Sequence, residues 1–155
     1  MPVIYRAAHS WHPWRHVREH YPHLGVNCHE PLPRDLRAAW TAAGIHLRPG
    51  LTQTQRRCAL THEIVHLERG APPRHPVLAL MEERTVEQLA ARRLIPLRAL
   101  TEALMWVDLA DRPALAEELW VDEPTLRTRL GGLTVRERTA VNVALVQRQP
   151  WNMDL

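Results

Sequence analysis

Helical periodicity of apolar residues dominates this chain, and its clearest example lies between residues 53 and 69. Thr52 and Gln55 form a capping box, in which a hydroxyl and an amide satisfy two backbone N–H groups at the start of a helix. Gly70 and the prolines after it end the segment. Its apolar residues lie on more than one side: Leu60, Ile64, Val65 and Leu67. The pattern therefore predicts a helix that is buried over much of its surface.

A second long helix is predicted from Pro76 to Leu94. Proline suits the first turn of a helix, and Pro96 prevents the helix from continuing. The apolar face of this segment comprises Leu78, Met81, Val86, Leu89 and Ala90. Another amphipathic helix is expected directly afterwards, at Leu97–Val107.

Shorter helical segments fill the rest of the C-terminal part. Pro113–Trp120 and Glu123–Leu130 are predicted as two short helices, with Asp122 as the N-cap of the second and Gly131-Gly132 as its stop. Thr134 and Glu137 form another capping box, which opens a last helix that runs to about Gln149.

The N-terminal part combines one short helix with three short strands. Ser10 is expected to cap a helix over residues 11–20. The predicted strands are residues 24–29, 36–40 and 44–48, and the turn Pro49-Gly50 ends the last of them. We therefore expect an α+β fold, with a small, curled antiparallel sheet beside the helix at 53–69 and a mainly helical C-terminal half. The expected division is a domain at 1–108 and a helical subdomain at 109–155.

Composition narrows the function classes only slightly. The chain has 155 residues, a formal net charge of +3, and no lysine, so that all twenty basic residues are arginine. These arginines are scattered and mixed with glutamates, so the basic net charge is only weak evidence for a nucleic-acid partner. No apolar run has the length of a membrane span, and the N-terminus lacks the pattern of a secretory signal. Cys28 and Cys58 form no disulfide framework and are predicted to be small core residues, so a reduced, cytoplasmic setting is expected.

The candidate chemistry lies in the sequence His62-Glu63-Ile64-Val65-His66, within the helix at 53–69. Four residues make just over one helical turn, so that both imidazoles project from one face and can hold one Zn²⁺. Glu63 then lies beside the metal, where it can accept a proton from a water molecule. This combination is typical of zinc-dependent peptide hydrolysis.

A catalytic zinc site needs a third protein ligand, and the next helix offers three glutamates. Glu83 is the preferred ligand if the Ala90 side of that helix packs on the histidine helix. Glu87, one turn further on, would then accept a hydrogen bond from a ligating histidine and fix its tautomer. Glu82 or Glu87 as the third ligand remains the alternative assignment.

Two segments resemble the ImmA/IrrE family of metallo-endopeptidases. They are Arg57-Cys58-Ala59-Leu60-Thr61-His62-Glu63-Ile64-Val65-His66 and Glu83-Arg84-Thr85-Val86-Glu87-Gln88-Leu89-Ala90-Ala91-Arg92-Arg93-Leu94-Ile95-Pro96, and the resemblance extends over roughly residues 30–135. It implies a zincin-like core, with His62, His66 and Glu83 as zinc ligands and Glu63 as the general base. The chain departs from the family pattern where that pattern has Ala, Asn and Phe: Val86, Glu87 and Leu89.

The resemblance also implies a function and a partner. The expected function is zinc-dependent cleavage of an intracellular regulatory protein, such as a phage or mobile-element repressor. The strand Gly44–Arg48 is the candidate edge on which an extended substrate would pair. The group that stabilises the oxyanion stays open among His46, Tyr21 and the arginines near the motif.

Two other function classes compete with this hypothesis. Residues 115–130 have the rhythm of a helix-turn-helix, whose second helix carries Thr125, Arg127, Thr128 and Arg129. Acidic residues around the turn would face phosphates badly, so an ordinary helical hairpin is favoured over a DNA-binding element. A catalytically silent zinc fold that acts as an interaction module is the other alternative, and the intact Glu63 argues against it. The spacing of His9, His12, His16 and His20 suggests a second metal site, although a solvated helix face is favoured.

Overall fold

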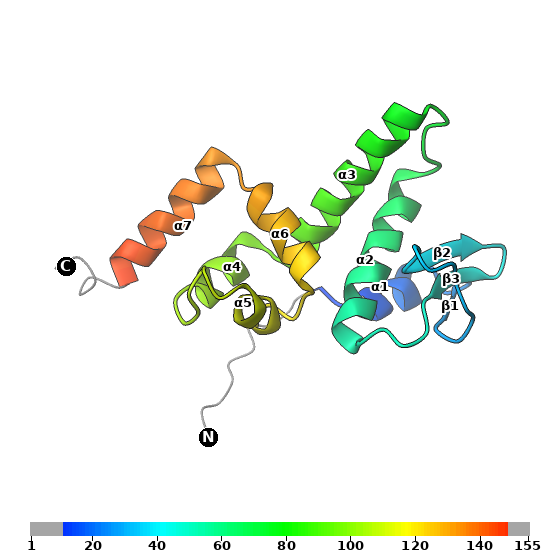
Figure 1. The fold of residues 1–155 in the computed structure, drawn as a ribbon, viewed down its shortest axis with the longest axis horizontal. Helices are drawn as coiled ribbons and strands as arrows, with labels where there is room; N and C mark the ends of the chain where they lie inside the picture. Colours follow the sequence, from blue (N-terminus) through cyan, green and yellow to red (C-terminus); the bar gives the residue numbers. More distant parts are fainter. Residues whose placement is uncertain (1–10, 149–155) are drawn as a thin grey trace, which may run out of the picture.

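The computed structural model describes residues 11–148 (Figure 1). Its elements are α1 (Pro13–His20), β1 (Gly25–Asn27), β2 (Ala38–Thr41), β3 (Gly44–Leu47), α2 (Gln53–Arg69), α3 (Pro76–Leu94), α4 (Leu97–Ala103), α5 (Arg112–Glu118), α6 (Glu123–Gly131) and α7 (Val135–Arg148). The fold is α+β and mostly helical, as predicted. None of the helices in the described part is both long and apolar enough to cross a membrane.

Predicted capping residues lie at the starts of three helices, α2, α6 and α7. In the Thr52–Gln55 capping box, the Gln55 N–H donates to Thr52 Oγ1 over 3.1 Å, and the Thr52 N–H donates to Gln55 Oε1 over 3.0 Å. Asp122 caps α6 through the Thr125 N–H at 3.0 Å. Thr134 and Glu137 form the second predicted box at the start of α7. Side-chain capping was readable from the sequence because it needs only residues three apart.

Several helix boundaries differ from the prediction by one to four residues, and two of these differences have a clear physical cause. The first helix begins at Pro13 with His12 as its N-cap, whereas Ser10, the predicted cap, lies outside the described residues. The ring of a proline disfavours helical geometry in the residue before it, so His12 stays extended. The helix predicted at Leu97–Val107 ends at Ala103, where the backbone tightens and the Trp106 N–H bonds to the Ala103 carbonyl.

The sheet is mixed, so the prediction of a wholly antiparallel sheet was wrong. Its strand order is β1-β3-β2; β2 pairs with β3 in an antiparallel hairpin, and β1 pairs with β3 in parallel. Alternating polarity predicts which residues form strands, but not which strands pair with each other. The long loop after β1 carries the chain past the position of β3, so that β2 forms on the far side of β3. Gly44 (φ 122°) permits the close pairing, because a Cβ there would lie 2.2 Å from the Gly25 carbonyl oxygen.

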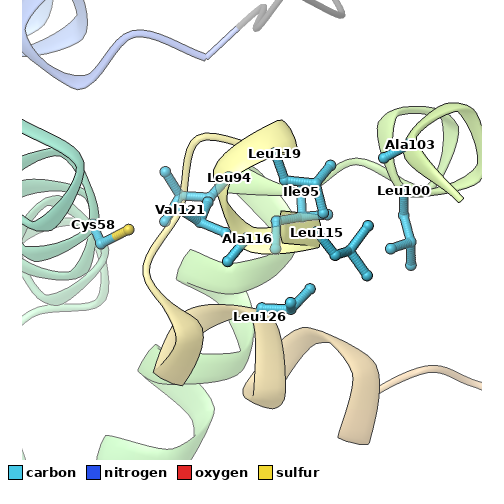
Figure 2. Close-up of a cluster of buried hydrophobic side chains, with 10 residues drawn as sticks. All are labelled: Cys58, Leu94, Ile95, Leu100, Ala103, Leu115, Ala116, Leu119, Val121 and Leu126. Atoms are coloured by element: carbon cyan, nitrogen blue, oxygen red, sulfur yellow. The ribbon is translucent and has the colours of Figure 1, made fainter. Parts of the chain in front are cut away.

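The helix α2 lies between two clusters of buried side chains. On one side it packs against the sheet and α1, with Ile45, Leu60 and Ile64 fully buried. On the other side Cys58 joins a larger cluster built by α3, α4, α5 and α6 (Figure 2). The burial on two sides agrees with the expectation for this helix. The larger cluster draws residues from both sides of the predicted boundary at 108/109, and that division stays a prediction.

The predicted apolar face of α3 is only partly buried. Val86 and Ala90 pack against Val65 of α2, whereas Leu78 and Met81 are more than half exposed and Leu89 is 38% exposed. Figure 1 shows the reason: α2 and α3 form an open pair, and the N-terminal turns of α3 extend away from the other helices. The periodicity of apolar residues identified one face of α3, but it could not predict how many turns of that face another element covers.

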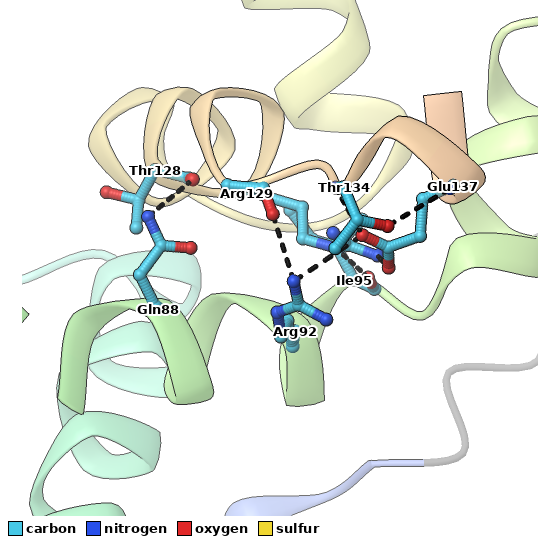
Figure 3. A network of polar contacts seen from close by, with 8 residues as sticks. Gln88, Arg92, Ile95, Thr128, Arg129, Thr134 and Glu137 are labelled. Carbon is cyan, nitrogen blue, oxygen red and sulfur yellow. Dashed lines mark hydrogen bonds and ion pairs between the residues drawn. The ribbon is translucent and has the colours of Figure 1, made fainter. Parts of the chain in front are cut away.

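A buried arginine joins the last two helices to the rest of the fold (Figure 3). Arg129, 2% exposed, donates to the Ile95 carbonyl over 2.8 Å and to Glu137 over 2.9 Å. Glu137 also accepts a bond from the Thr134 N–H. The hydrogen bond from Arg129 is the main reason that the pKa of Glu137 is lowered to about 2, and the Thr134 N–H adds to it.

We expect Glu137→Gln to lower the free energy of unfolding at pH 7 by about 1 to 3 kcal/mol, because the buried Arg129 loses its charged partner. The folded-state pKa is about 2, below the ordinary value of 4.5, so the carboxylate stabilises the fold above about pH 4.5. That contribution is lost as the pH falls toward 2. Urea denaturation from pH 7 downward should show the difference narrowing, with exposed Glu19→Gln as control. A difference independent of pH would contradict this account.

Candidate metal centre

His62 and His66 lie one turn apart on the same face of α2, as their spacing predicts. Their Nε2 atoms are 3.1 Å apart, and the centroids of the two rings are separated by 4.8 Å. Both side chains are partly buried, with 25% and 21% of their surface exposed. Burial lowers the pKa of His62, although the nearby Glu83 carboxylate raises it in part. The neutral imidazole that burial favours is the form that coordinates metals.

The carboxylate of Glu83 reaches both imidazoles from the neighbouring helix α3. Its Oε1 atom lies 2.9 Å from His62 Nε2, and its Oε2 atom lies 3.0 Å from His66 Nε2. The buried contact of Val65 with Val86 and Ala90 holds the two helices together beside this group. The Ala90 side of α3 therefore packs on the histidine helix, which is the arrangement that the choice of Glu83 required.

The three side chains fit a zinc ion by geometry and by donor type. Their ligand atoms all lie within 4.8 Å of one another, and this is the group with metal-binding potential among the described histidines, cysteines and acids. Ligands about 2.1 Å from a tetrahedral zinc are about 3.4 Å apart. The observed distances of 2.9 to 3.1 Å between these nitrogens and oxygens are a few tenths of an ångström shorter. Two imidazoles and one carboxylate leave a fourth position for water or substrate.

Glu63 lies beside the histidines and lines the same cavity. Both imidazoles pair with Glu83 and not with Glu63. Its side chain is 8% exposed, and burial is the main cause that raises the pKa of this carboxyl. His66 and a hydrogen bond from the Trp40 indole oppose that shift. A carboxylate held by one donor at the wall of a cavity can accept a proton from a group bound in that cavity.

The other two glutamates of α3 are placed differently from Glu83. Glu82 is turned to Arg69, whose Nη2 donates to Glu82 Oε2 over 2.8 Å. Glu87 is exposed and lines the cavity, and among the described residues its side chain has no hydrogen bond or ion pair. The structure therefore does not bring Glu87 to a histidine, and the hydrogen bond expected there is not observed. The geometry favours Glu83 over both alternatives as the third ligand.

A cavity of about 1010 Å³ contains the site. Its walls come from α2, α3, the segment Asp35–Trp40 and the start of α6. Across one part of it, Arg37 Nη1 pairs with Asp122 Oδ2 at 2.6 Å. Much of the lining is apolar: Leu36, Ala38, Ala59, Leu67, Ala90, Ala91 and Leu94. The dimensions suit a ligand larger than a single side chain.

The strand Gly44–Arg48 was the wrong choice for a substrate-binding edge. Its observed counterpart, β3, pairs on both sides and has no free edge, whereas β2 lies at the margin of the sheet. Ala38 and Trp40 of β2 also line the cavity, and β3 contributes no residue to it. The sequence marked β3 more strongly because its residues are all buried, and this burial comes from its central position.

The candidates for the oxyanion donor, among which the sequence could not choose, lie away from the cavity or are engaged in other contacts. His46 lies on the sheet face opposite α2, where its ring contacts Thr41 Oγ1 at 2.7 Å and Glu30 Oε2 at 3.1 Å. Tyr21 packs against the cluster beneath the sheet. Of the arginines near the motif, buried Arg57 donates to the Trp120 and Trp11 carbonyls. None of these three residues lines the cavity, and no oxyanion donor is assigned.

Sequence reasoning missed Arg37 and Trp40, which line the cavity from outside the motif. Both lie more than twenty residues before His62, and no local pattern distinguishes them from other surface residues. Their role follows only from the packing of β2 beside α2. The only hint in the sequence is that one arginine and one tryptophan lie within a predicted strand, at residues 36–40.

The residues behind the competing hypotheses are largely used inside the fold. Arg129 is buried, and Thr125 and Thr128 line the cavity that contains His62 and His66. Arg127 is therefore the one member of the predicted DNA-reading set that is exposed and clear of this cavity. Gln88 of α3 donates to the Thr128 carbonyl over 3.3 Å, and thus α6 packs on α3. His9 lies outside the described residues. In the described part, the stacked rings of His16 and His20 form no metal-binding group.

Comparisons with known proteins add no assignment to this site. No protein-family model, no curated protein and no solved structure matches the chain. The similarity to the ImmA/IrrE metallo-endopeptidases therefore remains a resemblance of the residues quoted above, and the site is interpreted from its own geometry.

We expect zinc to bind at about one ion per chain, and Glu83→Gln to weaken binding about tenfold to a hundredfold or more, because a charged ligand is lost. Glu82→Gln and Glu87→Gln are matched controls on the same helix and should retain zinc. Competitive titration against a chelating dye measures all four proteins. Loss of zinc in either control, with retention in Glu83→Gln, would reassign the third ligand.

Proposed function

We propose that this protein is a zinc-dependent metallo-endopeptidase with a zincin-like core. The observation that carries the proposal is the convergence of His62, His66 and Glu83 from two helices, with Glu63 in the same cavity. Two nitrogen ligands, one oxygen ligand and a separate carboxylate are the components of metal-assisted peptide hydrolysis. The resemblance to the ImmA/IrrE metallo-endopeptidases, drawn from the same residues, supports the same function.

In this proposal, one set of side chains binds the metal ion and another residue transfers the proton. His62, His66 and Glu83 would hold Zn²⁺, which supplies Lewis acidity toward a peptide carbonyl and a water molecule. Glu63 takes a proton from the attacking water and later gives it to the leaving amine. The indole of Trp40, through its hydrogen bond, keeps the Glu63 carboxylate oriented toward the cavity. The apolar walls exclude bulk water from the reacting bond.

The free edge of β2 is the surface that best suits an extended substrate. An edge strand presents unpaired backbone groups, and a peptide can add to it as another strand. The alternate residues Ala38 and Trp40 line the cavity beside Glu63. A protein substrate with a flexible, extended segment would fit this cleft. The family resemblance favours an intracellular regulatory protein, such as a phage or mobile-element repressor.

The exchange Glu63→Gln tests this function most sharply. The amide keeps the size of the side chain but cannot accept the proton, so we expect cleavage to fall by about 10²-fold or more while zinc binding is unchanged. Zinc-loaded wild type and variant are incubated with a library of unstructured peptides, and mass spectrometry identifies the new termini.

Two matched proteins complete this experiment. Glu87→Gln, also a cavity glutamate, should keep cleavage activity, and His66→Ala should lose zinc and cleavage together. Equal cleavage by wild type and Glu63→Gln at equal zinc content would refute the proposed function.

A further inference from the structure

A second pocket, of about 540 Å³, lies between α5, α6 and α7. Arginines from all three helices line it: Arg112 at the start of α5, Arg127 in α6 and Arg138 in α7. Glu123, Leu126, Leu130 and Gly131 complete the lining. No residue is shared with the lining of the metal cavity, so the two pockets are separate.

All three arginines are exposed, and in the described part of the chain none of their guanidinium groups donates to a carboxylate or a carbonyl. Other arginines are engaged by acids or carbonyls, as in the pairs Arg37–Asp122, Arg93–Glu68 and Arg129–Glu137. Three guanidinium groups and one carboxylate give the pocket a formal charge of +2. Like charges gathered around one hollow repel one another unless an anion joins them.

The backbone that carries these arginines is held in place. Leu115 of α5 and Leu126 of α6 are fully buried in the same cluster, which fixes the two helices to each other (Figure 2). The bond from Arg129 to Glu137 fixes α6 to the start of α7 (Figure 3). Arg127 lies two residues before Arg129, and Arg138 directly follows Glu137, so both lie next to this fixed contact. The helix backbones that carry the three arginines are therefore fixed around one hollow before a ligand binds.

We propose that this pocket binds the phosphate group of a small phosphorylated molecule. A guanidinium offers paired N–H donors that match the oxygens of a phosphate, and several of them can share one multiply charged group. A pocket of this volume also has room for an organic part beside Leu126 and Leu130. Glu123 reduces the positive charge of the pocket but does not cancel it.

The arrangement favours a compact phosphate over a nucleic-acid backbone. A backbone presents single charges in a row, and proteins meet it with cations spread along a groove or helix face. Here the arginines come from three helices to one hollow. The exposed stripe of α6 comprises Glu123, Arg127 and Gly131, and it carries a single arginine because Arg129 is buried and Thr128 lines the larger cavity.

Isothermal titration of the zinc-loaded protein with inorganic phosphate tests this proposal. We expect saturable one-to-one binding that weakens about tenfold or more in Arg127→Gln, because one charge-assisted contact is lost. Arg138→Gln should weaken it similarly, and the exchange of all three arginines should abolish it. Arg136→Gln is the matched control, since Arg136 is exposed on the same helix as Arg138 but does not line the pocket.

One further variant and one competing ligand show whether the phosphate binds in this pocket, at the metal centre, or on a nucleic-acid surface. His66→Ala should bind phosphate as wild type does; loss of binding there would place the phosphate at the metal centre and overturn the proposal. A short DNA duplex should compete weakly. Duplex binding that phosphate does not displace, equal weakening in Arg136→Gln, or the absence of saturable phosphate binding would each overturn it.

Discussion

The packing of α2 against α3 is the constraint on which the candidate site depends. Val65, Val86 and Ala90 make a small buried contact between the helices, and the ligand residues project beside it, with Glu83 within about 3 Å of both imidazoles. A small shift of α3 along α2 would break this convergence, since one turn of a helix moves a side chain by about 5.4 Å. Alanine at position 90 matters because a larger side chain would separate the helices.

The rest of the fold holds α2 from its other sides and shapes the cleft. The sheet and α1 bury Leu60 and Ile64, and the cluster under α4, α5 and α6 receives Cys58. Burial raises the pKa of the Cys58 thiol to about 11, so this cysteine is an inert packing residue although it borders the cavity. The pair Arg37–Asp122 joins the sheet side of the cleft to the start of α6. Thus the elements that stabilise the helix also form the walls around the histidines.

Features that depend on a few consecutive residues were predictable from the sequence. The capping boxes at Thr52 and Thr134, the breaks at Gly70 and Pro96, and the common face of His62 and His66 all follow from local spacing. Features set by packing between distant segments were not. The parallel pairing of β1 with β3, the exposure of Leu78 and Met81, and the places of His46 and Trp40 each depend on which element covers which face. The contact of Glu83, rather than Glu82 or Glu87, with both imidazoles could be anticipated because it was tied to one packing face, marked by Ala90.

X-ray absorption spectroscopy at the zinc edge tests the central claim most directly, because it reports the ligands of the bound ion itself. The account predicts two imidazole nitrogens and a carboxylate oxygen in the first coordination sphere, with a further oxygen from water, at distances of about 2.0 to 2.2 Å. A sulfur ligand at about 2.3 Å, or a spectrum without imidazole scattering, would contradict it.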